Sequence, residues 1–243
     1  MITSKGNPQY KKWLKLGQKK YRQQEGLFLV EGPHLVEEAQ KAGVLQEVLV
    51  CEDSNFGIET EATILRKDLF ARLVATVNSS GVIGVCRVQE PELDHFNRLL
   101  LVDGVQDPGN LGTLIRSALA FGFDGIVLSE DTVDIYNEKV VRSTQGAIFT
   151  LPILRRELAE FISDYQTNGG QALAATLNKD ALPLSAIETA PKMAFVVGNE
   201  GAGVRPAVVS ACNGSVVVEM STAVESLNVG VAGSILMHHF RQV

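Results

Sequence analysis

The chain has 243 residues, of which 45% are hydrophobic and 21% are charged, a composition that excludes disordered and fibrous proteins. Lysine and arginine number 22 against 28 aspartates and glutamates, and this net charge of −6, taken alone, argues against a nucleic-acid partner. The average hides an asymmetry, because residues 1–24 hold seven basic side chains and no acidic one, which leaves −13 on the rest. A basic end on an acidic body indicates a polyanionic partner.

Other classes of protein and site are also disfavoured by the sequence. No run reaches the roughly 18 to 20 apolar residues that span a bilayer, and the N-terminus lacks the apolar stretch of a secretory signal. Cys51, Cys86 and Cys212 stand far apart, which fits buried thiols in a reducing cytosol. His238 and His239 are adjacent and cannot form an i, i+4 ligand pair. We therefore expect a cytoplasmic protein without a metal.

The first third of the chain is predicted to alternate short helices and strands. Apolar periodicity gives helices near 8–20, 33–42 and 67–74, and strands at 27–30, 44–50, 61–65 and 81–87. Residues 88–97 are polar and break this pattern. We therefore predict a first α/β domain over 1–90, a linker over 91–97 and a second domain over 98–243.

The second domain is predicted to be an α/β fold with a parallel sheet. Residues 98–103 form a continuous apolar run, as in a buried parallel strand, and a helix over 111–121 is expected to stop at Gly122. Further strands are expected at 125–128, 171–175, 193–198 and 215–220, and a closing helix at 225–241. Strands that alternate with helices indicate a sheet covered on both sides.

Three loops at predicted strand ends hold the candidate site residues. Asn110 precedes Arg116 by six positions, and Arg116 is expected to emerge from an apolar helix surface. From spacing alone, a solvated helix arginine and a capping asparagine are the favoured explanation over a functional site. The loop after residue 197 has the order G-x-x-G-x-G, which is not the dinucleotide fingerprint and suits either a ligand or a tight turn. In the third loop, Ser226 and Asn228 fit helix capping or binding.

Taken in this order, the three loops resemble the motifs of the SpoU–TrmH branch of the SPOUT RNA methyltransferases. The first family motif, Asn-x-Gly with a following arginine, is matched by Asn110, Gly112 and Arg116. The second, Gly-Asn-Glu-x-x-Gly, is matched by Gly198, Asn199, Glu200 and Gly203. The third, Ser-Leu-Asn-Val, is matched by residues 226–229. One departure is Glu219, where many relatives carry a proline ahead of the third motif.

The resemblance implies a deep trefoil knot in the second domain and S-adenosyl-L-methionine as cofactor. On matching positions, backbone groups at four residues are expected to bind this cofactor: Gly198, Val218, Met220 and Leu227. It also implies methyl transfer to a ribose 2′-hydroxyl at a homodimer interface. Arg116 would hold a phosphate and stabilise the developing alkoxide, since an arginine pKa above about 12 makes a poor base. Asn110, Glu200, Ser226 and Asn228 would orient Arg116 and the ribose.

The first 90 residues resemble the small substrate-binding domain that often precedes this methyltransferase domain. Residues 7–8, the lysine-rich helix, and the segments 31–33 and 37–39 carry this second resemblance. RNA is expected to bind basic side chains at Lys11, Lys12, Lys15, Lys19, Lys20 and Arg22. Tyr10, Trp13 and Tyr21 are favoured for stacking on bases, and the alternative is a solvated amphipathic helix with Trp13 packed on its own domain.

Three functions are consistent with these observations. The first is an RNA 2′-O-ribose methyltransferase acting on ribosomal RNA or, as the next candidate, transfer RNA. The second is a catalytically silent RNA-binding or ribosome-assembly protein of the same fold, towards which only the Glu219 substitution leans. The third, a dinucleotide-dependent oxidoreductase, lacks its glycine fingerprint.

Overall fold

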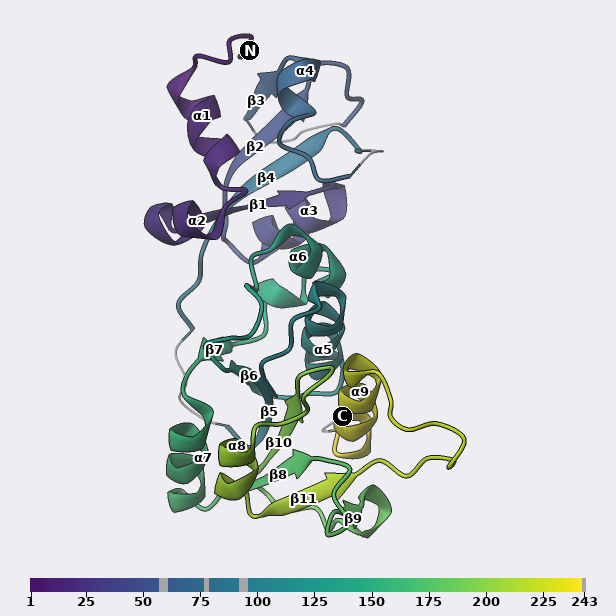
Figure 1. Ribbon diagram of the computed structural model, residues 1–243. Helices are drawn as coiled ribbons and strands as arrows, with labels where there is room; N and C mark the ends of the chain where they lie inside the picture. Colours follow the sequence, from purple (N-terminus) through teal and green to yellow (C-terminus); the bar gives the residue numbers. More distant parts are fainter. Residues whose placement is uncertain (57–60, 77–78, 92–95, 242–243) are drawn as a thin grey trace. The chain divides into compact units, whose positions relative to one another are not determined.

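The computed structural model describes residues 1–56, 61–76, 79–91 and 96–241 and divides into two compact units (Figure 1). Unit 1 contains Met1–Glu90 and Asp134–Thr150, and unit 2 contains Pro91–Val133 and Leu151–Val243. The segment Asp134–Thr150 thus groups with the first unit, although a continuous second domain over 98–243 was expected. Of the expected linker over 91–97, residues 92–95 lie outside the described part of the chain.

Unit 1 is built around a mixed four-stranded sheet in the order β1-β4-β2-β3. Strand β4 is antiparallel to β1 and β2, while β3 runs parallel to β2. The elements before residue 91 are α1 (Pro8–Lys15), α2 (Lys19–Glu25), β1 (Leu27–Glu31), α3 (Pro33–Lys41), β2 (Leu45–Cys51), β3 (Ala62–Leu65), α4 (Lys67–Phe70) and β4 (Val82–Arg87). The second part of unit 1, Asp134–Thr150, adds α6 (Glu138–Thr144) and the 3₁₀ turn η1 (Ala147–Phe149).

Aromatic packing and one ion pair explain why residues 134–150 join unit 1. The Phe28 ring lies 4.4 Å from the Tyr136 ring and 6.4 Å from the Phe149 ring, measured between centroids. Arg22 pairs with Asp134 at 2.6 Å. These contacts bury large apolar side chains, which is the main favourable term in folding.

The expected basic helix over 8–20 is two helices, α1 and α2, with a break at residues 16–18. The Asn7 side chain caps α1 by accepting hydrogen bonds from two backbone amides of its first turn. Tyr10 and Trp13, three residues apart on one face, are each 1% exposed and belong to the unit's core. They are therefore unavailable for stacking on RNA bases, and the alternative in which Trp13 packs inside its own domain is correct.

Unit 2 is a seven-stranded sheet in the order β7-β6-β5-β10-β8-β11-β9, and every strand pair in it is parallel. Its first elements are β5 (Arg98–Asp103), α5 (Pro108–Ala120), β6 (Gly125–Leu128), β7 (Ile153–Arg155), α7 (Leu158–Thr167) and β8 (Gln171–Ala175). The remaining elements are β9 (Leu182–Pro183), η2 (Leu184–Ala186), β10 (Met193–Gly198), α8 (Pro206–Ala211), β11 (Gly214–Val217) and α9 (Val229–His239). The predicted α/β class with a parallel sheet is confirmed.

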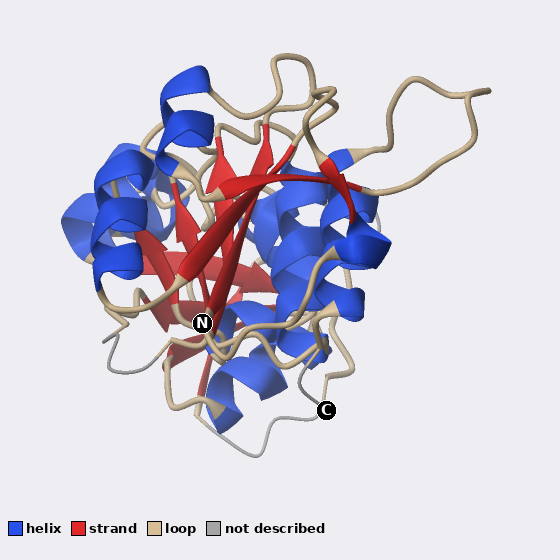
Figure 2. Cartoon of the chain, turned by 90° about the horizontal axis from the view of Figure 1, so that it is seen from below, coloured by secondary structure: helices blue, strands red, loops and turns tan. Residues whose placement is uncertain are grey.

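The order of the strands brings the three candidate loops to one edge of the sheet. Strands β5 and β10 are neighbours in parallel register, so their last residues, Asp103 and Gly198, pair. Helices α5 and α9 pack together, as do α7 and α8, and Figure 2 shows helices on both sides of the strands. Loops that follow the carboxyl ends of parallel strands form ligand sites in such sheets.

Helix ends refine the predicted boundaries of unit 2. Helix α5 begins at Pro108 after the Asp107 cap and stops before Gly122, whose φ of +71° is the conformation predicted for that stop. Helix α9 begins at Val229 instead of residue 225, because Asn228 is its N-cap. Strand β11 ends at Val217, so residues 218–228 form a loop that projects from the unit (Figure 1). Among the described residues, no helix has the length and apolarity needed to cross a membrane.

Candidate active site

One residue from each of the three loops meets in a hydrogen-bonded chain, which we call the motif cluster: Asn110, Glu200 and Asn228. The Asn110 side-chain amide donates to Glu200 Oε1 at 3.0 Å, and the Asn228 amide donates to Asn110 Oδ1 at 2.9 Å. Asn228 Oδ1 accepts from the backbone amides of Gly230 and Val231. Both asparagine amides are thereby oriented by their neighbours. The three motifs, up to 118 residues apart in sequence, form a single polar cluster.

Glu200 is the anchor of the motif cluster. Besides Asn110, its carboxylate accepts from the backbone amides of Gln106 at 3.2 Å and Asp107 at 3.0 Å. Desolvation raises the pKa of Glu200, but the hydrogen bonds from Asn110 and these amides outweigh it and hold the pKa below its ordinary value. Glu200 is therefore ionised at neutral pH and acts as an acceptor that fixes the start of α5.

The second loop is a tight turn that also borders a cavity. The backbone of Asn199 exchanges two hydrogen bonds with that of Gly203, at 3.0 and 2.9 Å, and the Asn199 amide donates to the Gly104 carbonyl at 2.8 Å. A Cβ at Gly198 would lie 2.1 Å from the Gly203 carbonyl carbon, so only glycine fits there. The loop is therefore both of the things that the sequence allowed: a tight turn and a border of a cavity that could hold a ligand.

An ion pair holds the end of this loop to the sheet. The Asp103 side chain is fully buried at the end of β5, and its carboxylate accepts from the Arg205 backbone amide at 2.8 Å and Nε at 2.7 Å. Arg205 Nη2 lies 2.6 Å from the same carboxylate. A buried carboxylate needs such partners, since an unpaired buried charge is costly. The pair fixes where the loop returns to α8.

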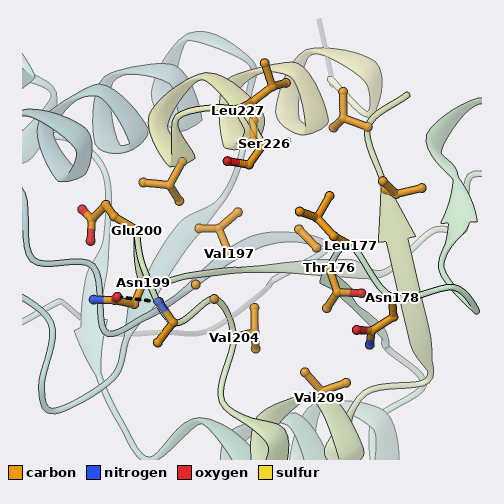
Figure 3. A pocket seen from close by; sticks show the side chains of 18 of the residues that line it. Thr176, Leu177, Asn178, Val197, Asn199, Glu200, Val204, Val209, Ser226 and Leu227 are labelled. Atoms are coloured by element: carbon orange, nitrogen blue, oxygen red, sulfur yellow. Dashed lines mark hydrogen bonds between the residues drawn. The ribbon is translucent and has the colours of Figure 1, made fainter. Parts of the chain in front are cut away.

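A cavity of about 770 Å³ opens beside the motif cluster (Figure 3). All four residues expected to bind the cofactor line it: Gly198, Val218, Met220 and Leu227. Ser226, Glu200 and Asn228 line it as well. Its walls are otherwise mostly aliphatic, and its volume lies within the range of small-molecule sites.

The lining fits an adenosine-containing cofactor. Glu200 is the one charged side chain among the residues that line the cavity, all of which belong to the described part of the chain. At Thr176, one of the lining residues, the side-chain hydroxyl is buried and has no hydrogen-bond partner among the described residues. Apolar walls with a few polar groups suit a nucleoside.

Arg116 is not part of the motif cluster. It is exposed on α5, among the buried side chains of Leu114, Ile115 and Ala118, as the apolar pattern around it predicted. Its guanidinium makes no hydrogen bond or ion pair with any residue that the structure describes. Within one chain, therefore, three of the five predicted catalytic residues line the cavity, Asn110 hydrogen-bonds to two of these three, and Arg116 stands apart.

Glu219, the departure from the family pattern, points away from the cavity. Its carboxylate accepts hydrogen bonds from the Ser185 hydroxyl and backbone amide, and these hold the pKa of Glu219 below its ordinary value. Val218 and Met220, on either side, line the cavity while Glu219 does not. The substitution therefore ties the end of β11 to η2 and places no charge in the candidate site.

The predicted RNA-binding side chains of unit 1 fall into two groups. Five lysines are exposed: Lys11, Lys12, Lys15, Lys19 and Lys20. Lys12 pairs with Glu25 at 2.9 Å, and Lys15 lies over the Tyr21 ring. Arg22, by contrast, is 6% exposed and donates to Asp134 and to the Leu16 carbonyl. The prediction that Arg22 binds RNA is therefore wrong, because its guanidinium is buried and hydrogen-bonded inside unit 1.

Comparisons with known proteins agree with this geometry. The model of the SpoU rRNA methylase family matches residues 97–238, and the MRM3-like substrate-binding domain matches residues 7–84. The chain belongs to the SpoU rRNA methylase family. It is 39% identical, over 99% of its length and 98% of the relative's, to the 23S rRNA (guanosine(2553)-2′-O)-methyltransferase RlmP of Bacillus subtilis.

Solved structures of relatives share the fold across almost the whole chain. A crystal structure of an RNA 2′-O ribose methyltransferase has a TM-score of 0.82 at 29% identity, covering 98% of this chain and 96% of that one. The AdoMet-bound rRNA methyltransferase of Sinorhizobium meliloti has a TM-score of 0.85 at 25% identity, covering 98% and 95%. The family member described here is thus an S-adenosylmethionine-dependent RNA methyltransferase, as its three motifs predicted.

Several residues of the site were not predicted from the sequence. Gln106, Asp103 and Arg205 hold the loops, and Thr176 lines the cavity. Of these residues, Asp103 could have been recognised from the sequence, since a carboxylate at the end of a predicted buried strand needs a partner. Among the described residues, no group of histidine, cysteine and acidic side chains is arranged to hold a metal ion.

Proposed function

We propose that this protein methylates a ribose 2′-hydroxyl of large-subunit ribosomal RNA, with the cavity beside the motif cluster as its cofactor site. The observation that carries the proposal is the hydrogen-bonded chain of Asn110, Glu200 and Asn228 at the mouth of a mostly aliphatic cavity. The relative's 23S rRNA substrate, at 39% identity over nearly the full length, supports the choice of RNA.

The motif cluster positions the ribose instead of exchanging its proton. The ionised Glu200 carboxylate already accepts three hydrogen bonds. Two come from backbone amides just before α5 and one comes from Asn110, so Glu200 holds the Asn110 side chain in place. Asn110 and Asn228, together with the exposed Ser226 hydroxyl, offer polar groups beside the cavity for the sugar. S-adenosylmethionine supplies a methyl group already activated by its sulfonium, so orientation of the hydroxyl is the main task left to the protein. Gly198, Val218, Met220 and Leu227 would hold that cofactor.

Arg116 completes the site from a second copy of the chain. In one chain it is exposed and free of described partners, although its family role requires it near the reacting hydroxyl. Its positive charge would bind an RNA phosphate and stabilise the alkoxide as it forms. A homodimer that places Arg116 of one subunit at the cavity of the other satisfies both requirements.

The outer face of α5 and α9 fits such a dimer. We define this face by Arg116, Leu119, Val231 and Ile235. The three apolar side chains are 38%, 47% and 38% exposed, respectively, and the two helices are joined by the Ser117–Ser234 hydrogen bond at 2.8 Å. Apolar side chains on paired helices indicate a surface that another protein covers.

Unit 1 would supply most of the RNA affinity, through the exposed lysines of α1 and α2. We also propose the family's trefoil knot for unit 2, since the loop over 218–228 and the turn after β10 border the same cavity. Ribosomal RNA as substrate places the protein in the cytoplasm.

A methylation assay tests the proposal. Purified protein, radiolabelled S-adenosylmethionine and unmodified large-subunit RNA should give one ribose methylation, detected as a single linkage that resists alkaline hydrolysis. Small-subunit RNA and transfer RNA serve as controls and should remain unlabelled. Cofactor binding without methylation of any RNA would favour the silent assembly protein, and label on transfer RNA alone would change the substrate. No feature of the described site favours the silent protein, because Glu219 faces Ser185.

A further inference from the structure

Two buried hydroxyl groups outside the three motifs are connected to the motif cluster. They belong to Ser129 and Thr132, which we call the hydroxyl pair, in the loop that follows β6, the strand next to β5. These residues are 1% and 3% exposed. Neither is among the described residues that line the cavity, so the proposed chemistry gives them no direct task. Buried polar side chains need hydrogen-bond partners, and the partners of this pair indicate its role.

The hydroxyl pair holds the backbone amide of Gly104, the first residue after β5. This amide donates to Ser129 Oγ at 2.9 Å and to Thr132 Oγ1 at 3.2 Å. The Ser129 hydroxyl itself donates to Asp131 Oδ1 at 2.6 Å, and the Thr132 hydroxyl donates to the Val102 carbonyl at 3.1 Å. Because each hydroxyl has one proton, which these acceptors take, both oxygens present lone pairs to the Gly104 amide.

The turn that begins at Gly104 also holds the Glu200 carboxylate. Two and three residues further along the chain, the backbone amides of Gln106 and Asp107 donate to this carboxylate at 3.2 and 3.0 Å. Both amides point at Glu200 only while the turn keeps its conformation. The hydroxyl pair, which binds the first amide of the turn, therefore contributes to the position of Glu200.

Further contacts keep the loop after β6 against this turn. The Val133 amide donates to the Val105 carbonyl at 3.0 Å, and Gln106 Nε2 donates to the Asp131 carbonyl at 2.6 Å. The hydrogen bond from Ser129 is the main cause that holds the pKa of the Asp131 carboxyl below its ordinary value. An ionised Asp131 accepts the Ser129 proton at neutral pH, which leaves Ser129 Oγ as an acceptor for the turn.

We propose that the hydroxyl pair positions the Glu200 carboxylate for methyl transfer, acting through Gly104 and its turn. The inference rests on the proposed function, in which Glu200 holds Asn110 in place for the ribose. Without the hydroxyl pair, the buried Gly104 amide would have lost both of these acceptors, and the turn would shift to satisfy it. The amides that hold Glu200 would move with the turn.

The cavity itself should be little affected. Its second loop is closed by the backbone pair of Asn199 and Gly203, and Asn199 Oδ1 accepts from the backbone amides of Gly201 and Ala202. Among these contacts of Asn199, only its bond to the Gly104 carbonyl reaches the turn. Loss of the hydroxyl pair should therefore slow methyl transfer at saturating cofactor and leave the affinity for the cofactor unchanged.

The test measures the rate of methyl transfer and cofactor affinity in purified variants of the full chain. Ser129→Ala/Thr132→Val removes both hydroxyls, and Thr132→Ser keeps them. Thr144→Val is the matched control, because it removes a buried threonine hydroxyl that donates to a carbonyl inside unit 1. Single-turnover kinetics at saturating S-adenosylmethionine and RNA gives the rate, and calorimetry gives the dissociation constant of S-adenosylhomocysteine. The double substitution is also made in a Glu200→Ala background.

We expect the double variant to be slower by about fivefold to tenfold, the effect of one hydrogen bond, with the dissociation constant within about twofold of the wild type. Thr132→Ser and Thr144→Val should react like the wild type. In the Glu200→Ala background the double substitution should slow the reaction by less than about twofold more, because the turn has no carboxylate left to hold. If the double variant does not fold, the single variants Ser129→Ala and Thr132→Val replace it, each with an expected loss of about twofold to threefold.

Three results would overturn the inference while the proposed function stands. A wild-type rate in the variants without the hydroxyls would show that the pair has no part in methyl transfer. The same fractional loss with and without the Glu200 carboxylate would make the pair purely structural. A loss of cofactor affinity as large as the loss of rate would assign the pair to the cavity wall. A wild-type protein that methylates no RNA would contradict the proposed function itself, and the inference with it.

Discussion

The motif cluster and the outer face of α5 and α9 differ in how their polar groups are satisfied. In the cluster, the Glu200 carboxylate accepts three hydrogen bonds and each asparagine amide has a partner. On the outer face, Arg116 has no partner among the described residues, and apolar side chains stand exposed beside it. One chain thus assembles the motif cluster but leaves Arg116, the proposed cation of the site, away from it. Under the proposed function, catalysis would depend on a dimer that brings Arg116 to the cavity, while cofactor binding would not.

Removing the cation should have the largest effect. Arg116→Ala is expected to lower the rate of methyl transfer by about 10² to 10³, the loss typical of one group that stabilises transition-state charge. The affinity for S-adenosylmethionine and the unfolding temperature should stay unchanged, since Arg116 is exposed and away from the cavity lining. Single-turnover kinetics and calorimetry measure these quantities. Arg156→Ala, an exposed arginine elsewhere in unit 2, is the control. A rate within threefold of the wild type would remove Arg116 from the chemistry.

Removing the loop anchor should reduce stability as well as activity. In Arg205→Ala the fully buried Asp103 carboxylate loses its charged partner and keeps only a backbone amide. Breaking a buried pair costs about 3 to 5 kcal/mol, and the half-exposed arginine reduces this to about 2 to 3 kcal/mol here. Urea unfolding measures the change, and Arg205→Lys should recover part of it. Wild-type stability in Arg205→Ala would mean that the loop is held by its backbone alone.

The Glu200 carboxylate should give a pH signature. Its pKa in the folded protein is below the ordinary value of 4.5, so the stabilisation from its charge is present above that value and lost as pH falls through the lowered pKa. We expect Glu200→Gln to reduce the rate about tenfold, since glutamine offers one acceptor oxygen where three donors converge. The stability gap between wild type and variant should be constant from pH 8 to 5 and should shrink below 4.5. A gap that closes already near pH 6 would contradict the assignment.

The smallest effect is expected in unit 1, whose lysines act by charge without fixed geometry. Replacing Lys11, Lys15, Lys19 and Lys20 by glutamine should weaken RNA binding and lower the slope of log affinity against log salt by up to about 3. Filter binding at several salt concentrations measures the slope. Lys67→Gln, which removes a lysine paired with Asp53, is the matched control. An unchanged slope in the fourfold variant would place the RNA elsewhere.

Sequence reasoning found the residues of the motif cluster through their resemblance to three family motifs at the ends of predicted strands. The parallel strand order of the structure then explains why Asn110, Glu200 and Asn228 meet at one edge. The stop of α5 at Gly122 was predictable for a similar local reason, a single backbone conformation that glycine adopts readily. The motif resemblance and a local conformational signal were sufficient for these features.

Features that depend on tertiary burial were not predictable in this way. Arg22 has the same local pattern as the lysines around it, and only the approach of Asp134, 112 residues away, buries it. The grouping of residues 134–150 with unit 1 has the same origin in long-range packing. Thr176 gave no sequence signal, because an unpaired hydroxyl is recognised only when its surroundings are known. Tyr10 and Trp13 are a similar case, since the sequence made them candidates for base stacking and only the packing of unit 1 shows that they belong to its core.

Mixed dimers test the central claim, that Arg116 serves the site of the other subunit. Arg116→Ala keeps an intact cavity, and Leu227→Arg fills the cavity while keeping Arg116. Each variant alone should be inactive. If the arginine acts across the dimer, an equimolar mixture refolded or co-expressed to exchange subunits forms one complete site in each mixed dimer, and about a quarter of wild-type activity returns. Activity that stays at the level of the separate variants, in mixtures shown to contain mixed dimers, would contradict the claim.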